Sequence, residues 1–235
     1  MQATYLGSET LAEGTILFRF SKPEGFVFHA GQSIDLTLIN PPETDAEGDT
    51  RAYSLCSAPF EEELKVATRM RDTAFKRVLG SMPVGTEVKV LGPFGTFFVP
   101  DNTTRPVVCL AGGIGITPFR SMLLDAKKRG LSHMIYLFYS NRRPEDAAFL
   151  KEFTEQVSPQ FVFVPTMTNA ELSFIPWAGE IGYIDRVMLE KYLPKGSSPV
   201  YYLAGPEPMT HAMRTLLESM GVSNDDIRYE EFAGY

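Results

Sequence analysis

The positions of hydrophobic residues follow two different patterns along the chain. Between residues 15 and 99, short apolar runs alternate with turns that contain Gly or Pro, and several runs place every second residue inward, as at Ile34, Leu36 and Leu38. A period of two predicts strands with one buried face. Apolar residues at helical spacing predict one short helix at 74–80. The first part of the chain is therefore predicted to be a small β-barrel or sandwich.

After a segment rich in Pro and Asn at 100–106, apolar strands alternate with helical segments. The predicted strands lie at 107–112, 133–140, 161–167 and 200–205, and the predicted helices at 117–130, 144–157, 184–194 and 207–221. This alternation predicts a doubly wound, mostly parallel sheet with helices on both faces. We therefore expect two domains, a β-barrel of Greek-key type over 1–101 and an α/β domain over 102–235.

The composition excludes several classes of protein. Hydrophobic residues make up 44% of the chain and charged residues 22%, and no run reaches the roughly 18 apolar residues that a membrane helix needs. A net charge of −7 argues against binding to nucleic acid. No signal peptide is recognisable, so we expect a cytoplasmic protein without a membrane span. Cys56 and Cys109 lie in apolar runs and are expected to be buried, and no metal or iron–sulfur site is predicted.

A glycine-rich turn is the strongest local signal in the second half. Gly112, Gly113 and Gly115 end an apolar strand, and Thr117 and Pro118 begin a helix. Glycines let a backbone approach a ligand closely, and the amides at a helix start attract a diphosphate. The spacing differs from the G-x-G-x-x-G fingerprint, and tight α/β turns also use glycine for structural reasons. We interpret the segment as a phosphate-binding turn.

Ligands of doubly wound sheets lie beyond the carboxyl ends of the strands, so residues after the later strands are expected to line the same site. These residues are Ser140, Asn141, Arg142, Arg143, Ala204, Gly205 and Pro206, and Met209 is a further candidate. The two arginines suit a ribose 2′-phosphate, which would favour NADP over NAD. The alternative is that they pair with Glu145 and Asp146.

Arg51, Tyr53 and Ser54 lie on one predicted strand, with Arg51 and Tyr53 on the same face. Such a strand suits an anionic, planar ligand, although most strands with these residues are only strands.

Three motifs in a fixed order make the signal more specific. R-x-Y-S lies at 51–54, G-G-x-G-x-T-P at 112–118 and G-P at 205–206. In this order they resemble the ferredoxin–NADP⁺ reductase superfamily of flavoenzymes. Phe28, Gly31 and Gln32 also fit the F-x-x-G-Q pattern of that family.

The resemblance implies FAD in the barrel, NADP or NAD on the α/β domain, and hydride transfer between the two at their interface. By resemblance, Arg51 binds the flavin phosphate, Tyr53 packs against the flavin and Ser54 donates a hydrogen bond near the reactive N5. The flavin ring would be lined by Leu55, Ala67, Thr68 and Met70, and the pyrophosphate would meet the amides of Thr73, Ala74 and Phe75. Phe232 or Tyr235 would stack over the flavin and move aside for nicotinamide; alternatively they pack on the barrel.

The chain also departs from the family pattern. Ala204 stands where many relatives have Cys, the segment 72–76 lacks the usual Gly and Ser, and no iron–sulfur domain is expected. A basic cluster suggests an acidic redox partner such as ferredoxin or flavodoxin; it consists of Arg69, Arg71, Lys76 and Arg77. The alternatives are an NAD(P)H:flavin or quinone reductase without a protein partner, and a reductase-like subunit that turns over only within a complex.

Overall fold

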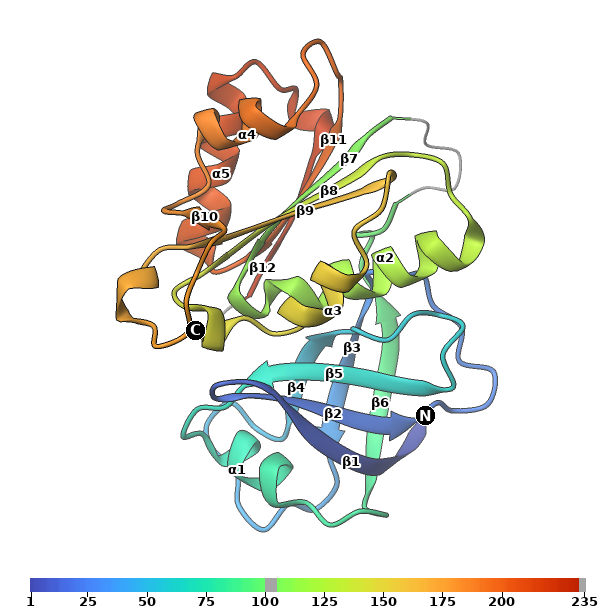
Figure 1. Ribbon diagram of the computed structural model, residues 1–235. Helices are drawn as coiled ribbons and strands as arrows, with labels where there is room; N and C mark the ends of the chain where they lie inside the picture. Colours follow the sequence, from blue (N-terminus) through green and yellow to red (C-terminus); the bar gives the residue numbers. More distant parts are fainter. Residues whose placement is uncertain (100–104, 233–235) are drawn as a thin grey trace. The chain divides into compact units, whose positions relative to one another are not determined.

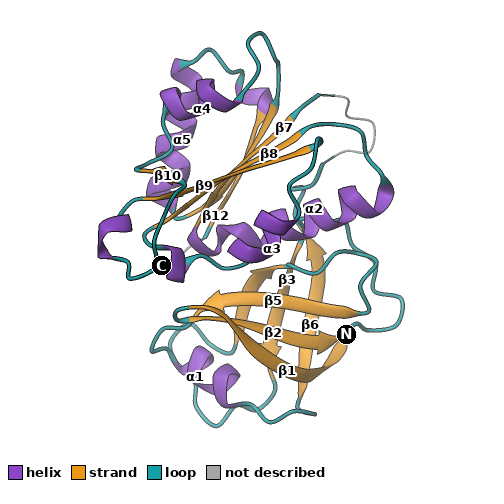
Figure 2. Ribbon diagram, in the orientation of Figure 1, coloured by secondary structure: helices purple, strands orange, loops and turns teal. Residues whose placement is uncertain are grey.

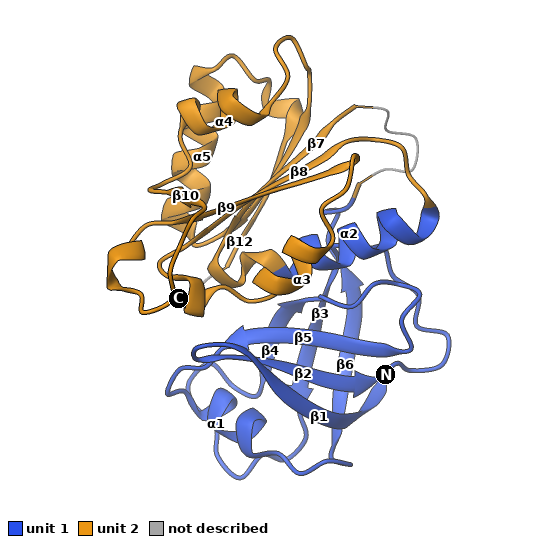
Figure 3. Ribbon diagram, viewed as in Figure 1, with its two compact units in different colours: residues 1–98, 117–129 blue, residues 99–116, 130–235 orange. Residues whose placement is uncertain are grey.

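The computed structural model describes residues 1–99 and 105–232, and the chain forms two compact units (Figure 3). Unit 1 comprises Met1–Phe98 and Thr117–Arg129, and unit 2 comprises Val99–Ile116 and Gly130–Tyr235. Helix α2 (Thr117–Arg129) therefore packs with the first unit, although it follows the first strand of the second. The division into a flavin domain and a nucleotide domain near residue 101 stays a prediction.

Unit 1 is built on an antiparallel sheet of six strands in the order β4-β3-β6-β1-β2-β5 (Figure 1). The strands are β1 (Gln2–Ala12), β2 (Thr15–Ser21), β3 (Ser33–Leu38), β4 (Thr50–Ser54), β5 (Glu63–Arg69) and β6 (Glu87–Phe94). Directly after β4, the Cys56 N–H donates to Lys65 O of β5 at 2.9 Å. This bond links the two ends of the sheet, and the insertion of β6 between β3 and β1 gives Greek-key connections.

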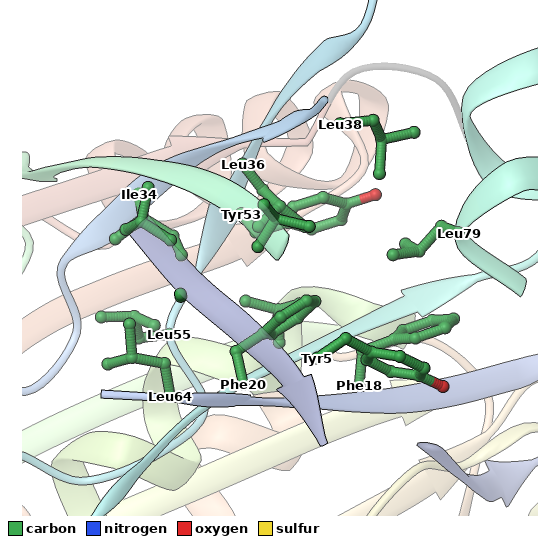
Figure 4. Packing of buried hydrophobic residues seen from close by; sticks show 14 of the residues in the cluster. Tyr5, Phe18, Phe20, Ile34, Leu36, Leu38, Tyr53, Leu55, Leu64 and Leu79 are labelled. Atoms are coloured by element: carbon green, nitrogen blue, oxygen red, sulfur yellow. The ribbon is translucent and has the colours of Figure 1, made fainter. Parts of the chain in front are cut away.

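The interior of unit 1 follows from the period-two pattern. Ile34, Leu36 and Leu38 of β3 all point inward, and Phe18 and Phe20 of β2 are fully buried with them (Figure 4). Helix α1 (Ala74–Ser81) lies where the sequence predicts it and buries its own apolar face against this core. The predicted β-barrel is confirmed.

Within unit 1, helix α2 donates two hydrogen bonds to the carbonyls of consecutive residues. The Ser121 hydroxyl donates to Ser57 O at 2.6 Å in a fully buried bond, and the Arg120 guanidinium donates to Cys56 O at 2.7 Å. Because these carbonyls follow the R-x-Y-S strand directly, α2 is held on the segment that continues β4.

Unit 2 contains a fully parallel sheet in the order β10-β9-β8-β7-β11-β12 (Figure 1). Its strands are β7 (Val107–Gly112), β8 (Ile135–Asn141), β9 (Phe161–Met167), β10 (Glu180–Ile181), β11 (Val200–Gly205) and β12 (Ile227–Glu231). Its longer helices are α3 (Leu150–Glu155), α4 (Arg186–Tyr192) and α5 (Glu207–Ser219), and its short 3-10 helices are η1 (Gly113–Ile116), η2 (Pro144–Asp146), η3 (Ala170–Leu172) and η4 (Asn224–Asp226).

Helices cover both faces of this sheet. Helices α4 and α5 lie along one face (Figure 2). There, alternate residues of the central strands pack with Leu189 of α4 and Leu217 of α5. On the other face, Phe153 of α3 contacts Phe161 and Phe163 of β9, with ring centroids 6.3 and 5.5 Å apart. Strands β7 and β11 are consequently buried along their whole length, which explains their unbroken apolar sequences. The predicted doubly wound sheet is confirmed.

The predicted helix at 144–157 is wrong in its first half. η2 ends at Asp146, Ala147 is extended, and Phe149 has a left-handed φ of 59° before α3 begins. The bidentate pairing of Arg143 with Asp146 stabilises the short first turn, and the buried Phe149 directs the chain back onto the sheet. In the described part of the chain, no helix is long and apolar enough to cross a membrane.

Candidate functional site

In unit 1 the fold brings the R-x-Y-S strand and the start of α1 together. The Arg51 guanidinium lies 5.0 Å from the centroid of the Phe75 ring, and the Tyr53 ring lies 6.2 Å from the same ring. A cation held against an aromatic face is favourable. Two segments that lie about twenty residues apart in sequence therefore form one cluster, as the family resemblance implies.

Tyr53 is largely enclosed by the core of unit 1. Its side chain is 9% exposed, and burial raises the pKa of its phenol to about 12 despite a hydrogen bond with Thr68. The phenol therefore remains neutral at physiological pH. The role of Tyr53 as a ring that packs against flavin stays a prediction.

The other residues predicted to face the flavin lie at the ends of β4 and β5. Ser54 and Leu55 are buried, and the Leu55 N–H donates to Gln32 O at 3.0 Å. The Gln32 side-chain amide donates to Gly95 O at 2.9 Å. The F-x-x-G-Q motif thus holds the end of β4 in position. Ala67 and Thr68 are also buried, whereas Met70 is partly exposed.

Gly31 of the same motif permits a close approach of chains. A Cβ on Gly31 would lie 2.1 Å from Phe97 O, and its φ of 102° is one that side chains rarely adopt. Local packing and backbone conformation therefore require glycine at position 31, which the motif alone does not reveal.

The start of α1 is an ordered helix terminus. The Thr73 hydroxyl caps the helix by accepting a hydrogen bond from the Lys76 N–H at 3.3 Å. Ala74 and Phe75 in the first turn are buried. The amides of this turn suit an anion, since a helix N-terminus carries partial positive charge.

Several carboxylates surround this region, and the sequence pattern did not indicate that they would. They belong to the acidic loop, residues 41–49 between β3 and β4, which the pattern presents only as surface. Its Asp45 and Glu47 carboxylates lie 3.1 and 3.0 Å from Arg51 Nη2, and its Glu43 pairs with Arg77. Acidic residues directly before a motif arginine are the signal that could have indicated these ion pairs.

Carboxylates partly neutralise the basic cluster, and a backbone carbonyl of the cluster accepts a hydrogen bond from one of its cations. Arg77 is paired with both Glu43 and Asp72, and Lys76 Nζ donates to Arg69 O at 2.7 Å. Arg71 is exposed. The positive surface there is therefore smaller than the count of basic residues suggests.

In unit 2 the glycine turn, residues 112–116, lies at the carboxyl end of β7. Chain order proceeds outward from β7 through β8 and β9 in one direction and through β11 and β12 in the other, so the gap between β7 and β11 is the topological switch point. Ligands of doubly wound sheets bind at this point. The predicted phosphate-binding turn is thus at the edge where a dinucleotide would bind.

The glycines of the turn serve two different purposes. A Cβ on Gly115 would lie 2.2 Å from Ala204 O, and one on Gly112 would lie 2.2 Å from the Met209 sulfur. These two glycines are required for packing. Gly113, by contrast, has open space around its Cβ position and a left-handed φ of 53°. At Gly113 a ligand can approach the backbone without steric obstruction.

The C-terminal G-P motif and the last strand meet the glycine turn at the same edge. A Cβ on Gly205 would lie 3.1 Å from Gly112 N, and Pro206 precedes α5. The Phe232 N–H donates to Gly205 O at 3.0 Å, which places this aromatic residue beyond the end of β12. Tyr235, the other terminal candidate, lies outside the described residues.

The two candidate arginines after β8 have different surroundings. Arg143 forms a bidentate pair with Asp146, with nitrogen–oxygen distances of 3.1 and 3.0 Å, and the Asp146 side chain is only 4% exposed. Arg142 is exposed beside it. The pairing alternative therefore holds for Arg143, and Arg142 remains the candidate for a phosphate.

Two further groups at this edge bear on the chemistry. Ser140 is partly exposed and pairs with Gly112 across the sheet. The buried side-chain nitrogen of Asn141 has no hydrogen-bond partner among the described residues. A buried donor without an acceptor is costly in the protein alone and is satisfied when a ligand supplies an oxygen.

Both cysteines are buried and free, as predicted. Burial raises the pKa of the Cys56 thiol to about 12 and raises that of Cys109 as well. Neither thiol is a nucleophile at neutral pH, because the thiolate is the reactive form.

Comparison with known proteins agrees with this arrangement. The family model of the oxidoreductase NAD-binding domain matches residues 109–215. The F subunit of the Na⁺-translocating NADH-quinone reductase of Haemophilus influenzae is 31% identical over 201 residues, covering 78% of this chain and 48% of that protein. The glycine betaine monooxygenase reductase subunit of Chromohalobacter salexigens is 30% identical over 230 residues, covering 95% of this chain and 61% of that protein.

The chain thus spans about half the length of the first of these relatives and three fifths of the second. Among solved structures, a ferredoxin NADP⁺ reductase from Neisseria gonorrhoeae with bound FAD and NADP has the same fold, with a TM-score of 0.80 at 23% identity over 98% of each chain. Residues 109–215 thus match the oxidoreductase NAD-binding domain family, and the chain has the fold of the ferredoxin–NADP⁺ reductase superfamily, which its three ordered motifs also resemble.

Proposed function

We propose that the protein passes hydride between NAD(P)H and FAD and delivers electrons onward to a redox partner. The observation that carries the proposal is the position of the glycine turn at the topological switch point, in a chain whose other unit presents Arg51 beside a helix start. The parallel sheet does not need Arg51 in order to fold, and the barrel does not need the glycine turn. A dinucleotide and a flavin phosphate explain both.

The donor sets fit the two cofactors. Gly113 offers open backbone, and the Asn141 side chain offers an unused donor at the same edge of the sheet. Arg51 and the first amides of α1 offer a cation and helix-terminal N–H groups for a flavin phosphate. FAD, when bound, supplies two-electron and one-electron chemistry, whereas the chain supplies binding, orientation and exclusion of water.

NADP is the proposed nucleotide because Arg142 is exposed at the carboxyl end of β8. Its guanidinium suits a ribose 2′-phosphate, and the neighbouring Arg143 is already engaged with Asp146. A cytoplasmic location is part of the proposal, because NAD(P)H is the reductant of that compartment.

The partner is proposed to be an acidic redox protein such as ferredoxin or flavodoxin. Arg71 is exposed in the basic cluster and is the residue to test. We expect Arg71→Glu to slow electron transfer to such a partner and to weaken its dependence on ionic strength. Rates that do not respond to either salt or this substitution would exclude docking at the basic cluster.

The decisive experiment is an absorbance spectrum of the purified protein before and after anaerobic addition of NADPH or NADH. We expect the visible absorbance bands of oxidised flavin, and we expect the reductant to bleach them. Mass spectrometry of the released cofactor distinguishes FAD from FMN. A colourless protein that FAD does not reconstitute would overturn the proposed function.

Turnover with an artificial acceptor separates a free enzyme from a subunit of a complex. The flavin-loaded protein is expected to reduce ferricyanide with NAD(P)H alone. Full flavin occupancy without such turnover would indicate a chain that works only within a larger assembly.

A further inference from the structure

The acidic loop engages the very cation that the proposed function assigns to the flavin phosphate. Arg51 Nη1 donates to the backbone carbonyls of Glu47, Gly48 and Thr50 at 3.0, 3.0 and 2.8 Å. Arg51 Nη2 lies within 3.1 Å of the carboxylates of Asp45 and Glu47. Both terminal nitrogens of the guanidinium therefore face the acidic loop.

The Asp45 carboxylate has the surroundings of a bound anion. Besides Arg51, it accepts hydrogen bonds from the backbone N–H of Glu47 at 3.0 Å and from that of Ala74 in the first turn of α1. Partial burial alone would raise the pKa of Asp45, but these hydrogen bonds outweigh burial and lower it. At neutral pH a carboxylate thus lies between the guanidinium and the helix start.

We propose that Asp45 is an internal competitor for the flavin phosphate and thereby determines how strongly the barrel prefers phosphorylated flavins over riboflavin. The inference rests on the proposed function, because it assumes that a flavin binds at Arg51. It concerns the affinity of the site and does not require that hydride transfer has been demonstrated.

Asp45 and a flavin phosphate carry the same sign of charge and would use the same donor, the Arg51 guanidinium. A phosphate that approaches Arg51 meets Asp45 on Nη2, and like charges a few ångströms apart repel strongly where water is partly excluded. The Asp45 side chain is 31% exposed and that of Glu47 is 75% exposed. Asp45 is therefore less screened by solvent and has the larger effect, so the phosphate must displace it or share Arg51 with it.

The acidic loop is also anchored at a second point, which keeps Asp45 near Arg51. The Glu43 carboxylate accepts two hydrogen bonds from Arg77 of α1, at 3.0 and 2.6 Å. Because α1 and the loop are joined in this way, the local concentration of the Asp45 carboxylate at Arg51 is high. A free phosphate has no such advantage.

The test is a titration of flavin-free protein with riboflavin, FMN and FAD, followed by flavin fluorescence. We expect Asp45→Asn to lower the dissociation constants of FMN and FAD about tenfold, the size of one charge-assisted contact, and to leave that of riboflavin unchanged. Asp45→Glu, which keeps the charge, is expected to resemble the parent protein. Thermal melting verifies that each variant is folded.

Asp72→Asn is the matched control. It removes the same charge beside the start of α1, but its carboxylate pairs with Arg77 and not with Arg51. We expect it to change the affinity for all three flavins less than about twofold, as for an exposed charge. An equal gain in this variant would show a general charge effect and overturn the role of Asp45.

Other outcomes are equally decisive. Weaker binding of FMN and FAD by Asp45→Asn would mean that Asp45 orients Arg51 for the phosphate, and unchanged binding would mean that Asp45 does not affect the phosphate at all. Either result would exclude competition. Failure of every variant and of the parent protein to bind any flavin would overturn the proposed function itself. Because the parent protein is titrated alongside, the two failures are distinguishable.

Discussion

The glycine turn and the Arg51 cluster offer positive charge to an anion by different means. In the glycine turn, backbone amides at a strand-to-helix junction are positioned by close packing, since Gly115 and Gly112 leave no room for a side chain. In the Arg51 cluster a side chain carries the charge, and neighbouring carboxylates hold it. A site made from backbone is inseparable from the fold, whereas a site made from side chains is adjusted by its charged neighbours.

The comparison predicts that substitution within the glycine turn affects folding most. In Gly115→Ala the new Cβ meets Ala204 O at 2.2 Å and Gly205 N at 2.7 Å, so strand β11 must move. We expect the free energy of unfolding to fall by about 3 kcal/mol. Chemical denaturation followed by circular dichroism measures the loss.

Gly113→Ala is the control for this prediction. Its Cβ meets nothing within 4 Å, and only the left-handed φ of 53° is unfavourable, at a cost of about 1 kcal/mol. Equal losses in the two variants would show that the close packing at Gly115 costs no more than the left-handed backbone at Gly113.

The sequence is sufficient to predict those parts of the fold that are periodic or strongly apolar. Strands β7, β9 and β11 coincide with their predicted ranges because each is an apolar run bounded by turns. Strand β1 was not predicted, since beyond Tyr5 most of its residues are partly or fully exposed and a glycine and irregular pairing interrupt it. β12 was missed for a similar reason, because only Ile227 among its five residues is buried.

The motifs of the candidate site could be predicted from the sequence, but the ion-pair partners of its arginines could not. R-x-Y-S predicts Arg51 as an anion ligand, yet nothing in the motif indicates that Asp45 reaches it across a loop. Likewise, the adjacent Arg142 and Arg143 are equivalent in sequence, and only the short turn at η2 brings Asp146 to Arg143. Ion pairs depend on local backbone geometry, which hydrophobic periodicity does not encode.

The two adjacent arginines are expected to differ, because Arg143 contributes to stability and Arg142 is proposed to bind a ligand. Arg143→Ala leaves the buried Asp146 carboxylate without its bidentate partner, and we expect the free energy of unfolding to fall by about 2 kcal/mol. Urea denaturation at pH 7 measures this effect. A change below about 0.5 kcal/mol, as for ordinary surface residues, would contradict the structural role of the pair.

Arg142→Ala is expected to behave in the opposite way. Its side chain is exposed, so stability should change by less than about 0.5 kcal/mol. If the guanidinium binds the 2′-phosphate, the dissociation constant of NADPH should rise about tenfold while that of NADH stays the same. Equal weakening of both nucleotides would remove Arg142 from the 2′-phosphate site.

An ion pair at the amino end of β7 provides the smallest effect and calibrates the others. Arg105 Nη1 lies 2.7 Å from the Asp226 carboxylate, and both side chains are partly exposed, by 40% and 26%. The hydrogen bond from Arg105 outweighs desolvation and lowers the pKa of Asp226 below its usual value. Because such pairs are screened by solvent, Asp226→Asn is expected to cost about 0.5 kcal/mol at pH 7.

The sign of the pH dependence follows from the lowered pKa of Asp226. The unfolded chain binds this proton more tightly than the folded one, so the stabilisation is complete above the unfolded pKa and is lost as pH falls through the folded pKa. Parent protein and Asp226→Asn should therefore differ in denaturation midpoint at pH 7 and converge in acid, once the pH has fallen below the folded pKa of Asp226. If the two proteins still differ in acid, packing and neutral hydrogen bonds, not charge, account for the difference. The loss of stability in Arg143→Ala would then also have to be measured in acid before it is ascribed to charge.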